Sequence, residues 1–225
     1  MKDRIHDARP QVLSFFLHGP AGRLEALLNT GSRQPAHAAV VCHPHPLYGG
    51  TMHNKVVFHV MKALNGFGFP VLRFNFRGAG LSQGEHDLGR GEVQDVQAAL
   101  DWLDAEFRVP LIFAGFSFGA ATGLKAACPD PRVVAAISVG TPIQIEDRAY
   151  GYEFLQACSK PKLLVSGTRD VFAPRAALES LAAGLAEPKQ LVLIDGADHF
   201  FDAHLNELKQ VIAGWVGTAL ALPNP

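Results

Sequence analysis

The chain has 225 residues, of which 48% are hydrophobic, and a net charge of −1. This length and composition allow a sizeable core, and we expect a single domain over residues 1–225. The near-neutral charge gives no bias towards nucleic acid or an anionic membrane, so we expect neither as a partner. Residues 1–7 lack the apolar stretch of a secretory signal, and no apolar run is long enough to span a membrane. Three cysteines without paired or metal-ligand spacing indicate reduced thiols, so we expect a cytoplasmic protein.

The first half of the chain alternates predicted strands and helices. Residues 12–17 and 23–29 are two predicted strands joined by a turn that contains Gly and Pro, which favours a β-hairpin. Apolar runs and helical periodicity then predict a strand over 38–42, a helix over 54–65, a strand over 71–76 and a helix over 92–107. The last of these has the clearest amphipathic pattern, with Val96, Leu100 and Leu103 on one face.

Residues 115–119 form the sequence Gly-Phe-Ser-Phe-Gly. The apolar run 109–114 before it predicts a buried strand, and the alanine-rich run 120–128 after it predicts a short helix. A G-x-S-x-G sequence between a strand and a helix is typical of a nucleophile elbow, where the serine occupies a sharp turn. We expect Gly115 and Gly119 to give the room for this turn, and Ser117 to present its Oγ at the carboxyl end of the strand.

The second half of the chain continues the alternation. We expect strands over 133–139, 163–166 and 191–194, and helices near 150–158 and over 174–184 and 202–220. Short apolar strands that alternate with helices predict an α/β fold with a mostly parallel central sheet, helices on both faces and an antiparallel N-terminal hairpin.

A serine hydroxyl becomes a useful nucleophile only beside a base, and the base needs a group that fixes its tautomer. Ligands bind at the carboxyl ends of the strands in an open parallel sheet. Asp170 follows the strand 163–166 and His199 follows the last strand, so both are expected at the same edge as Ser117. Asp195 and Asp198 are weaker alternatives for the acid, because Asp198 adjoins His199 and would need a tight backbone turn to reach its ring. Asp170 could also only cap the turn before the next helix.

The order Ser117, Asp170, His199 at these strand ends resembles the α/β-hydrolase superfamily. The chain is similar to lidless α/β-hydrolases, in the style of dienelactone-hydrolase-like proteins and small serine esterases. The similarity extends over residues 12–218 and also includes His-Pro-His-Pro-Leu-Tyr-Gly-Gly at 43–50 and Asn-Phe-Arg-Gly-Ala-Gly-Leu-Ser at 75–82. Ser117 stands where dienelactone hydrolases carry cysteine, so the resemblance implies hydrolysis without lactone specificity. Only about twenty residues lie where a lid is commonly inserted, after the strand that ends near Gly140, so we expect no cap domain.

The oxyanion of such a reaction needs two preorganised N–H donors. The amide of Phe118, directly after the nucleophile, is the expected first donor. The second should come from the loop 43–50, whose prolines have no N–H, which leaves the amides of His45, Leu47 and Tyr48. We favour Leu47.

Two other features of these segments have competing interpretations. His43 and His45 could be metal ligands, but further ligands at matching spacing are missing, so we expect them to fix the loop by hydrogen bonds. Arg77 could be catalytic, but a structural ion pair is the favoured interpretation. We expect no metal and no cofactor.

These residues predict a serine esterase that cleaves small carboxylic esters through an acyl-enzyme intermediate. A thioesterase or a small acyl-peptidase would use the same residues, and the sequence does not separate them. A catalytically silent hydrolase fold used as a binding protein is disfavoured, because all three positions of the triad are filled. The expected partner is a small ester with an acyl group of about two to six carbons, and the expected state is a monomer or homodimer.

Overall fold

The computed structural model describes residues 11–145 and 148–223. Residues 1–7, for which we expect no secretory signal, lie outside the described residues. The central element is a sheet of eight strands in the order β1-β2-β4-β3-β5-β6-β9-β10. Its strands are β1 (Val12–Gly19), β2 (Gly22–Asn29), β3 (Ala38–Cys42), β4 (Val71–Phe74), β5 (Leu111–Phe116), β6 (Val133–Val139), β9 (Lys162–Gly167) and β10 (Lys189–Ile194). None of the helices in the described part of the chain has the length and apolar character that crossing a membrane requires.

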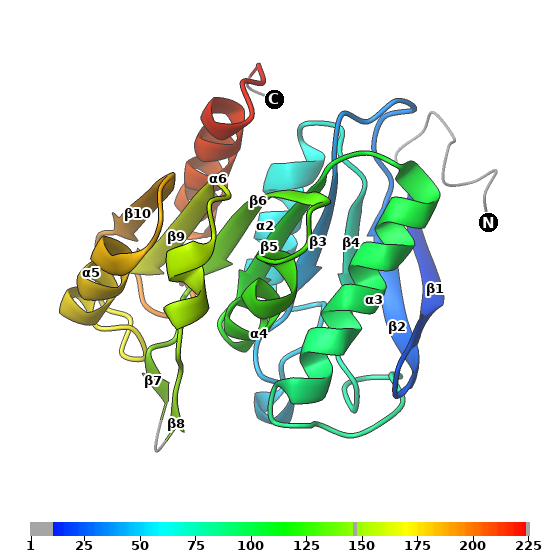
Figure 1. Cartoon of the computed structure of the whole chain (residues 1–225), viewed down its shortest axis with the longest axis horizontal. Helices are drawn as coiled ribbons and strands as arrows, with labels where there is room; N and C mark the ends of the chain where they lie inside the picture. Colours follow the sequence, from blue (N-terminus) through cyan, green and yellow to red (C-terminus); the bar gives the residue numbers. More distant parts are fainter. Residues whose placement is uncertain (1–10, 146–147, 224–225) are drawn as a thin grey trace.

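The pairing of the strands confirms the predicted fold class. β1 and β2 form an antiparallel hairpin, and β2 pairs antiparallel with β4. All further pairs, from β4 through β3, β5, β6 and β9 to β10, are parallel. Parallel strands need crossover connections, which here contain α-helices in every case except the connection from β6 to β9, and the helices cover both faces of the sheet. Figure 1 shows the arrowheads of the parallel strands pointing to the lower edge, so the loops that follow them gather there.

In the described residues, five α-helices cover the sheet, and the core has two parts as a result. The helices are α2 (Lys55–Asn65), α3 (Arg90–Phe107), α4 (Phe118–Ala127), α5 (Arg175–Gly184) and α6 (Leu205–Ala219). α2 and α6 pack on one face, where Val60, Leu64 and Ile212 are fully buried. α3 and α4 pack on the other face, where Leu100 and Leu103 are fully buried. Burial on both faces explains why the central strands are continuous apolar runs instead of alternating ones.

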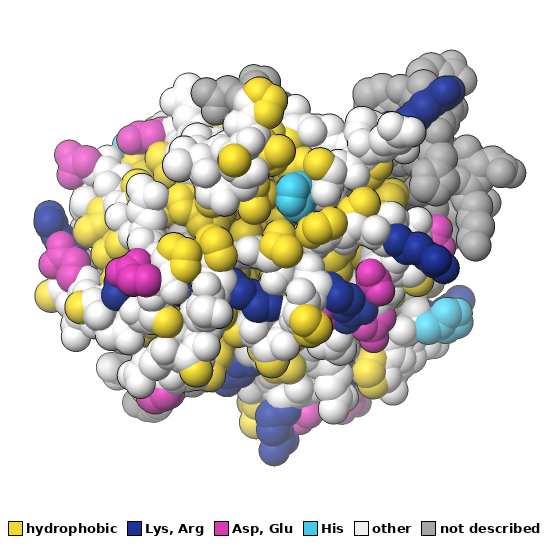
Figure 2. Space-filling view, turned by 45° about the horizontal axis from the view of Figure 1, so that its top comes forward, with side chains coloured by type: hydrophobic (Ala, Val, Ile, Leu, Met, Phe, Trp, Pro, Cys, Tyr) yellow, Lys and Arg dark blue, Asp and Glu magenta, His cyan; other side chains and the backbone are white. Residues whose placement is uncertain are grey.

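The surface agrees with the near-neutral composition. Figure 2 turns the edge where the parallel strands begin towards the viewer, and there basic and acidic side chains are interspersed among hydrophobic ones. The candidate site lies at the other edge, where the strands end.

One predicted helix is wrong. Residues 150–158 form no α-helix: a small hairpin of β7 (Gln144–Ile145) and β8 (Arg148–Ala149) is followed by a 3₁₀ turn, η2 (Glu153–Ala157). The Tyr152 hydroxyl donates to the Pro142 carbonyl at 2.7 Å, and the chain is extended again at Cys158. These anchors leave too few free residues for the turns of an α-helix, whose nucleation is costly.

Candidate active site

The serine turn is the sharpest connection in the site. β5 ends at Phe116, two residues later than the predicted strand end, and α4 begins at Phe118. Ser117 alone therefore links the strand to the helix. Its backbone has φ 54° and ψ −121°, a combination that residues with a Cβ avoid. A Cβ at Gly115 would lie 2.6 Å from the Ala120 nitrogen, and one at Gly119 would lie 2.4 Å from the His43 carbonyl oxygen. Both positions therefore require glycine.

Three side chains from different strand ends meet at this turn. His199 Nε2 lies 3.0 Å from Ser117 Oγ, and His199 Nδ1 lies 2.8 Å from Asp170 Oδ2. Because a carboxylate can only accept, Nδ1 carries the proton and Nε2 is left to accept from the serine hydroxyl. All three residues are about 95% buried, with exposures of 4% for Ser117, 4% for Asp170 and 5% for His199. The geometry is that of a nucleophile, a base and an orienting acid.

Further hydrogen bonds fix the Asp170 carboxylate. Ser166 Oγ donates to its Oδ2 at 2.9 Å, and the Phe172 amide donates to its Oδ1 at 3.0 Å. Ser166 lies on β9, so the strand itself orients the acid. No sequence motif signals this contact, although Ser166 precedes Asp170 by one tight turn.

The alternative acids are engaged elsewhere. Asp195 Oδ1 accepts from Thr168 Oγ1 at 3.2 Å, and Asp198 Oδ1 accepts from the Phe200 and Asp202 amides at 3.1 and 3.0 Å. Asp198 thus stabilises the turn that carries His199. The structure brings Asp170, and neither alternative, to the imidazole.

Aromatic rings and one glycine surround the His199 imidazole. Its centroid lies 5.0 Å from that of Phe116, 4.7 Å from that of Phe172 and 5.3 Å from that of Phe200. A Cβ at Gly140, where φ is 54°, would lie 3.1 Å from His199 Cε1. The ring is therefore confined to the orientation in which Nε2 faces the serine.

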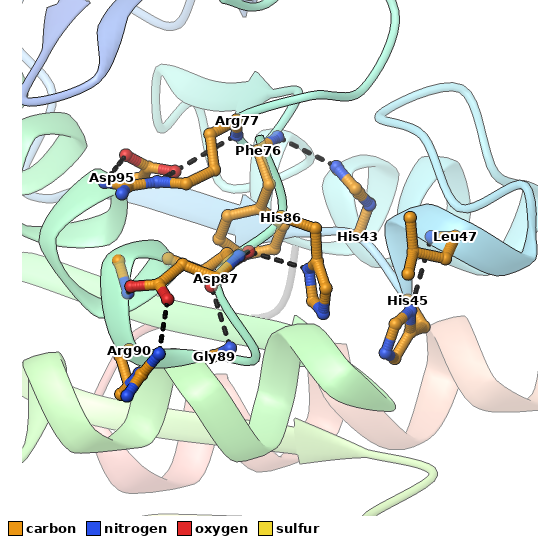
Figure 3. Close-up of polar contacts among 12 residues, drawn as sticks. His43, His45, Leu47, Phe76, Arg77, His86, Asp87, Gly89, Arg90 and Asp95 are labelled. Carbon is orange, nitrogen blue, oxygen red and sulfur yellow. Dashed lines mark hydrogen bonds and ion pairs between the residues drawn. The ribbon is translucent and has the colours of Figure 1, made fainter. Parts of the chain in front are cut away.

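The loop after β3 carries the other candidate donors. It contains the 3₁₀ turn η1 (Pro46–Tyr48), and the Leu47 amide donates to His45 Nδ1 at 3.3 Å (Figure 3). The Tyr48 amide donates to the His45 carbonyl at 3.1 Å. Leu47 is 68% exposed and does not line the cleft at Ser117, whereas His45 does. Of the three residues, His45 and Tyr48 therefore lie at the cleft, and Leu47, the residue expected from the sequence, does not.

His43 has a structural position. Its Nε2 accepts from the Phe76 amide at 3.0 Å, and its Nδ1 donates to the Pro44 carbonyl at 2.6 Å. Burial lowers the pKa of His43 to about 4, because the charged imidazolium is poorly solvated there. With both ring nitrogens bonded, His43 is not available as a metal ligand. The part of the chain that the structure describes holds no group of three side chains arranged to bind a metal ion.

Arg77 is also structural. Its Nε and Nη2 donate to the two oxygens of Asp95 on α3 at 3.0 and 2.8 Å, and its amide donates to Asp95 Oδ2 (Figure 3). These hydrogen bonds to Asp95 raise the pKa of Arg77. The pair joins the segment after β4 to α3, so Arg77 takes part in a structural ion pair, which was the interpretation favoured from the sequence.

A cleft opens at Ser117. It has a volume of about 240 Å³, which is below the range typical of sites for drug-sized ligands. Its lining residues come from loops after several strands: Pro44, His45, Tyr48, Gly49, Gly50, Asn54, Ser117, Ile145, Phe172, His199 and Phe200. Within the described residues, β7, β8 and η2 are the only elements between β6 and β9, so no cap domain covers the cleft.

Fold and site together are those of an α/β serine hydrolase without a lid, and comparison with known proteins agrees. The sequence profile described as "Alpha/beta hydrolase domain" matches residues 37–210. The chain therefore belongs to the α/β hydrolase family. An uncharacterized protein of Rickettsia prowazekii is 36% identical over 217 residues, covering 93% of this chain and 89% of that protein.

Two solved structures show the same architecture. An α/β serine hydrolase homologue from Coxiella burnetii is 38% identical with a TM-score of 0.82, covering 89% of this chain and 95% of that one. A serine hydrolase without a lid from Xanthomonas campestris is 31% identical with a TM-score of 0.81, covering 96% of this chain and 97% of that one. The likeness extends over nearly the whole length of each protein, so the three share the α/β-hydrolase fold.

Proposed function

We propose that this hydrolase is a serine esterase that cleaves small carboxylic esters through an acyl-enzyme intermediate. The observation that carries the proposal is the chain of two hydrogen bonds from Asp170 through His199 to Ser117, at the base of an open cleft. A buried hydroxyl in a strained turn, facing an oriented imidazole, is what nucleophilic catalysis by serine requires.

The geometry supports the following steps. Ser117 Oγ attacks the ester carbonyl while His199 Nε2 takes its proton, and the Asp170 carboxylate stabilises the imidazolium that forms. The tetrahedral intermediate collapses, the C–O bond to the alcohol breaks, and His199 returns the proton to the leaving oxygen. Water then attacks the acyl-serine with His199 again as base. Breakdown of this second intermediate releases the carboxylic acid and restores the Ser117 hydroxyl.

Two backbone amides are proposed to hold the oxyanion. Phe118 supplies the first, as the residue that follows the nucleophile at the start of α4. For the second we assign the amide of His45 in place of Leu47, because His45 lines the cleft beside Ser117 and Leu47 does not. The ring centroid of His45 lies 4.7 Å from that of Phe118, the residue that carries the first donor.

The cleft supports a short acyl group. Its small volume and its apolar and aromatic lining, which includes Ile145, Phe172 and Phe200, leave little room for a long chain. Each CH₂ that stays in water forgoes up to about 0.8 kcal/mol of binding. We expect kcat/KM for p-nitrophenyl esters to peak at acyl groups of about two to six carbons. Matched thioesters and anilides distinguish the esterase from a thioesterase or an acyl-peptidase.

The test is covalent labelling of the serine. A fluorophosphonate should label one site in the wild-type protein, and Ser117→Ala should abolish the labelling. Ser117→Ala and His199→Ala should each lower kcat by roughly 10⁴- to 10⁶-fold, and the double variant should lose little more, because the triad acts as a unit. Ser180→Ala, an exposed serine on α5, is the matched control. Labelling that survives Ser117→Ala contradicts the proposal, and a protein that is neither labelled nor active fits a silent binding protein.

A further inference from the structure

A second histidine–carboxylate pair lies behind the cleft, outside the triad. Glu92 belongs to the first turn of α3, and its side chain is fully buried. Its two oxygens accept from the amides of Asp87 and Gly89 at 2.9 and 2.8 Å, which fixes the segment before the helix. A buried carboxylate with its oxygens bonded in this way has a rigid position.

His86 contacts this carboxylate. Its Nδ1 lies 2.7 Å from Glu92 Oε1, an ion-pair distance without the alignment of a hydrogen bond, and its side chain is 6% exposed. Its Nε2 is buried and has no hydrogen-bond partner among the described residues. A buried polar nitrogen without a partner costs free energy, which an apolar ring of similar size would avoid. Filling space therefore does not account for a histidine at this position.

The ring of His86 packs against the loop 43–50 and against Phe118. Its centroid lies 4.7 Å from that of His45 and 5.5 Å from that of Phe118. His45 and Phe118 are 4.7 Å apart, so the three rings form one cluster. Figure 3 shows His86 between the segment that carries Asp87 and Gly89 and the loop that carries His45.

The cluster matters because of the residues that compose it. His45 and Phe118 carry the two amides that we assigned to the oxyanion, and they come from segments more than seventy residues apart in the chain. Donors of an oxyanion hole must be fixed before the reaction, because their contribution depends on preorganised distances. The cluster is where the two donor segments make side-chain contact, and His86 touches both.

We propose that His86, held by Glu92, is a positioning residue that fixes the His45 and Phe118 amides for the oxyanion. This inference rests on the proposed function. His86 does not line the cleft, so it acts through His45 and Phe118 and not on the substrate. Its effect belongs to the transition state, in which the oxyanion forms, and leaves substrate binding nearly unchanged.

Two variants of His86 separate its contacts. His86→Phe keeps a ring against His45 and removes the tie to Glu92, whereas His86→Asn keeps a donor for Glu92 and removes the distal part of the ring. Loss of one oxyanion donor typically costs 10²- to 10³-fold in kcat. Displacing donors that are still present should cost less, so we expect each variant to lower kcat for p-nitrophenyl acetate by about ten- to a hundredfold. KM should change less than about threefold.

A matched control is available in the chain. His37 is a second histidine with a buried nitrogen that has no hydrogen-bond partner among the described residues, and its ring packs on Phe69 at 5.2 Å. His37 directly precedes β3, so it lies at the edge where the parallel strands begin, opposite the site. His37→Phe should leave kcat and KM unchanged. Wild-type kcat in either folded His86 variant, or a rise in KM at unchanged kcat, overturns the proposal. A wild-type protein that fluorophosphonate does not label is a failure of the proposed function instead.

A measurement on the wild-type protein keeps the proposal testable if both variants fail to fold. Reaction of Ser117 with a fluorophosphonate places an oxygen in the oxyanion hole. The imidazole NMR signals of His45 and His86 should then shift, and those of His37 should not. A His86 signal that stays unchanged in this adduct overturns the proposal.

Discussion

The strained turn at Ser117 makes an unusual prediction about stability. Its φ of 54° and ψ of −121° suit glycine, and every other residue there stores strain. Ser117→Gly and Ser117→Ala both remove the hydroxyl and its hydrogen bond to His199. These two variants therefore differ in the backbone strain and in one methyl group, and we expect the glycine variant to be the more stable of the two.

The magnitude follows from two opposing terms. A residue in such a backbone conformation stores about 1–3 kcal/mol, which glycine releases. Glycine gains more freedom in the unfolded chain, and this costs it about 0.5–1 kcal/mol relative to alanine. Ser117 is only 4% exposed, so glycine also forgoes the burial of one methyl group, which adds up to about 0.8 kcal/mol to this cost. The balance favours Ser117→Gly by about 0.5 kcal/mol, or about 1–2 °C in Tm for a chain of this size.

Urea unfolding, with calorimetry as the second probe, measures this difference. The control pair is Ser180→Gly and Ser180→Ala in the interior of α5, where the order should reverse and alanine should be better by about 1 kcal/mol. If Ser117→Ala equals or exceeds Ser117→Gly in stability, the turn is not strained and the nucleophile elbow is wrongly described. Because both Ser117 variants lack the nucleophile, activity does not complicate the comparison.

The remaining predictions concern the residues around the turn. Burial lowers the pKa of His43 to about 4 in the folded protein, against 6.5 for a free side chain, so its stabilising contribution is present above pH 6.5 and is lost as the pH falls towards 4. In urea unfolding over this pH range, the wild type should lose about 3 kcal/mol more unfolding free energy than His43→Gln. An equal dependence of unfolding free energy on pH in both proteins would contradict a buried, neutral His43. Gly119→Ala places a Cβ 2.4 Å from the His43 carbonyl oxygen, so we expect the unfolding free energy to fall by about 1–3 kcal/mol and kcat to fall with it. A variant with unchanged stability and kcat would show that the elbow can accommodate a Cβ at this position. Asp170→Asn should lower kcat by about 10⁴-fold, because the asparagine would favour the wrong tautomer of His199. Asp198→Asn should keep a kcat near that of the wild type, because the Asn Oδ1 can still accept from the same two amides. A large loss of kcat in Asp198→Asn and none in Asp170→Asn would show that Asp198 orients the base.

The sequence was sufficient for the parts of the site that depend on topology. The apolar runs locate strands β5, β9 and β10, and parallel strands end at one edge of a sheet, so Ser117, Asp170 and His199 had to be neighbours. The choice of Asp170 over Asp198 followed from local geometry, because a residue adjacent to the histidine cannot easily reach its ring.

Parts that depend on individual contacts were beyond the sequence. Whether His45 or Leu47 offers its amide depends on hydrogen bonds inside a turn of a few residues, which leave no periodic pattern. The helix expected over 150–158 was wrong because the Tyr150 amide bonds to the Ile143 carbonyl and the Tyr152 hydroxyl to the Pro142 carbonyl, which tie the start of this segment to the chain before it. The pair of Glu92 and His86 has no motif, since its importance comes from rings that meet in space.

Because the described chain has no cap over the cleft, the contacts that hold the oxyanion donors in place before the substrate binds have a larger role in catalysis. Enzymes with a lid exclude water and complete the site when the lid closes. Here Tyr48 is 68% exposed and Phe200 is 43% exposed at the cleft, so the mouth of the site stays open to solvent. Stabilisation of the oxyanion must then come from donors that are already in place before the substrate arrives. The elbow fixes Phe118 through the backbone, and backbone hydrogen bonds close the turn after His45, but the position of the His45 ring against Phe118 depends on side-chain contacts. A buried carboxylate that holds a ring against that loop therefore provides the preorganisation that closure of a lid provides elsewhere.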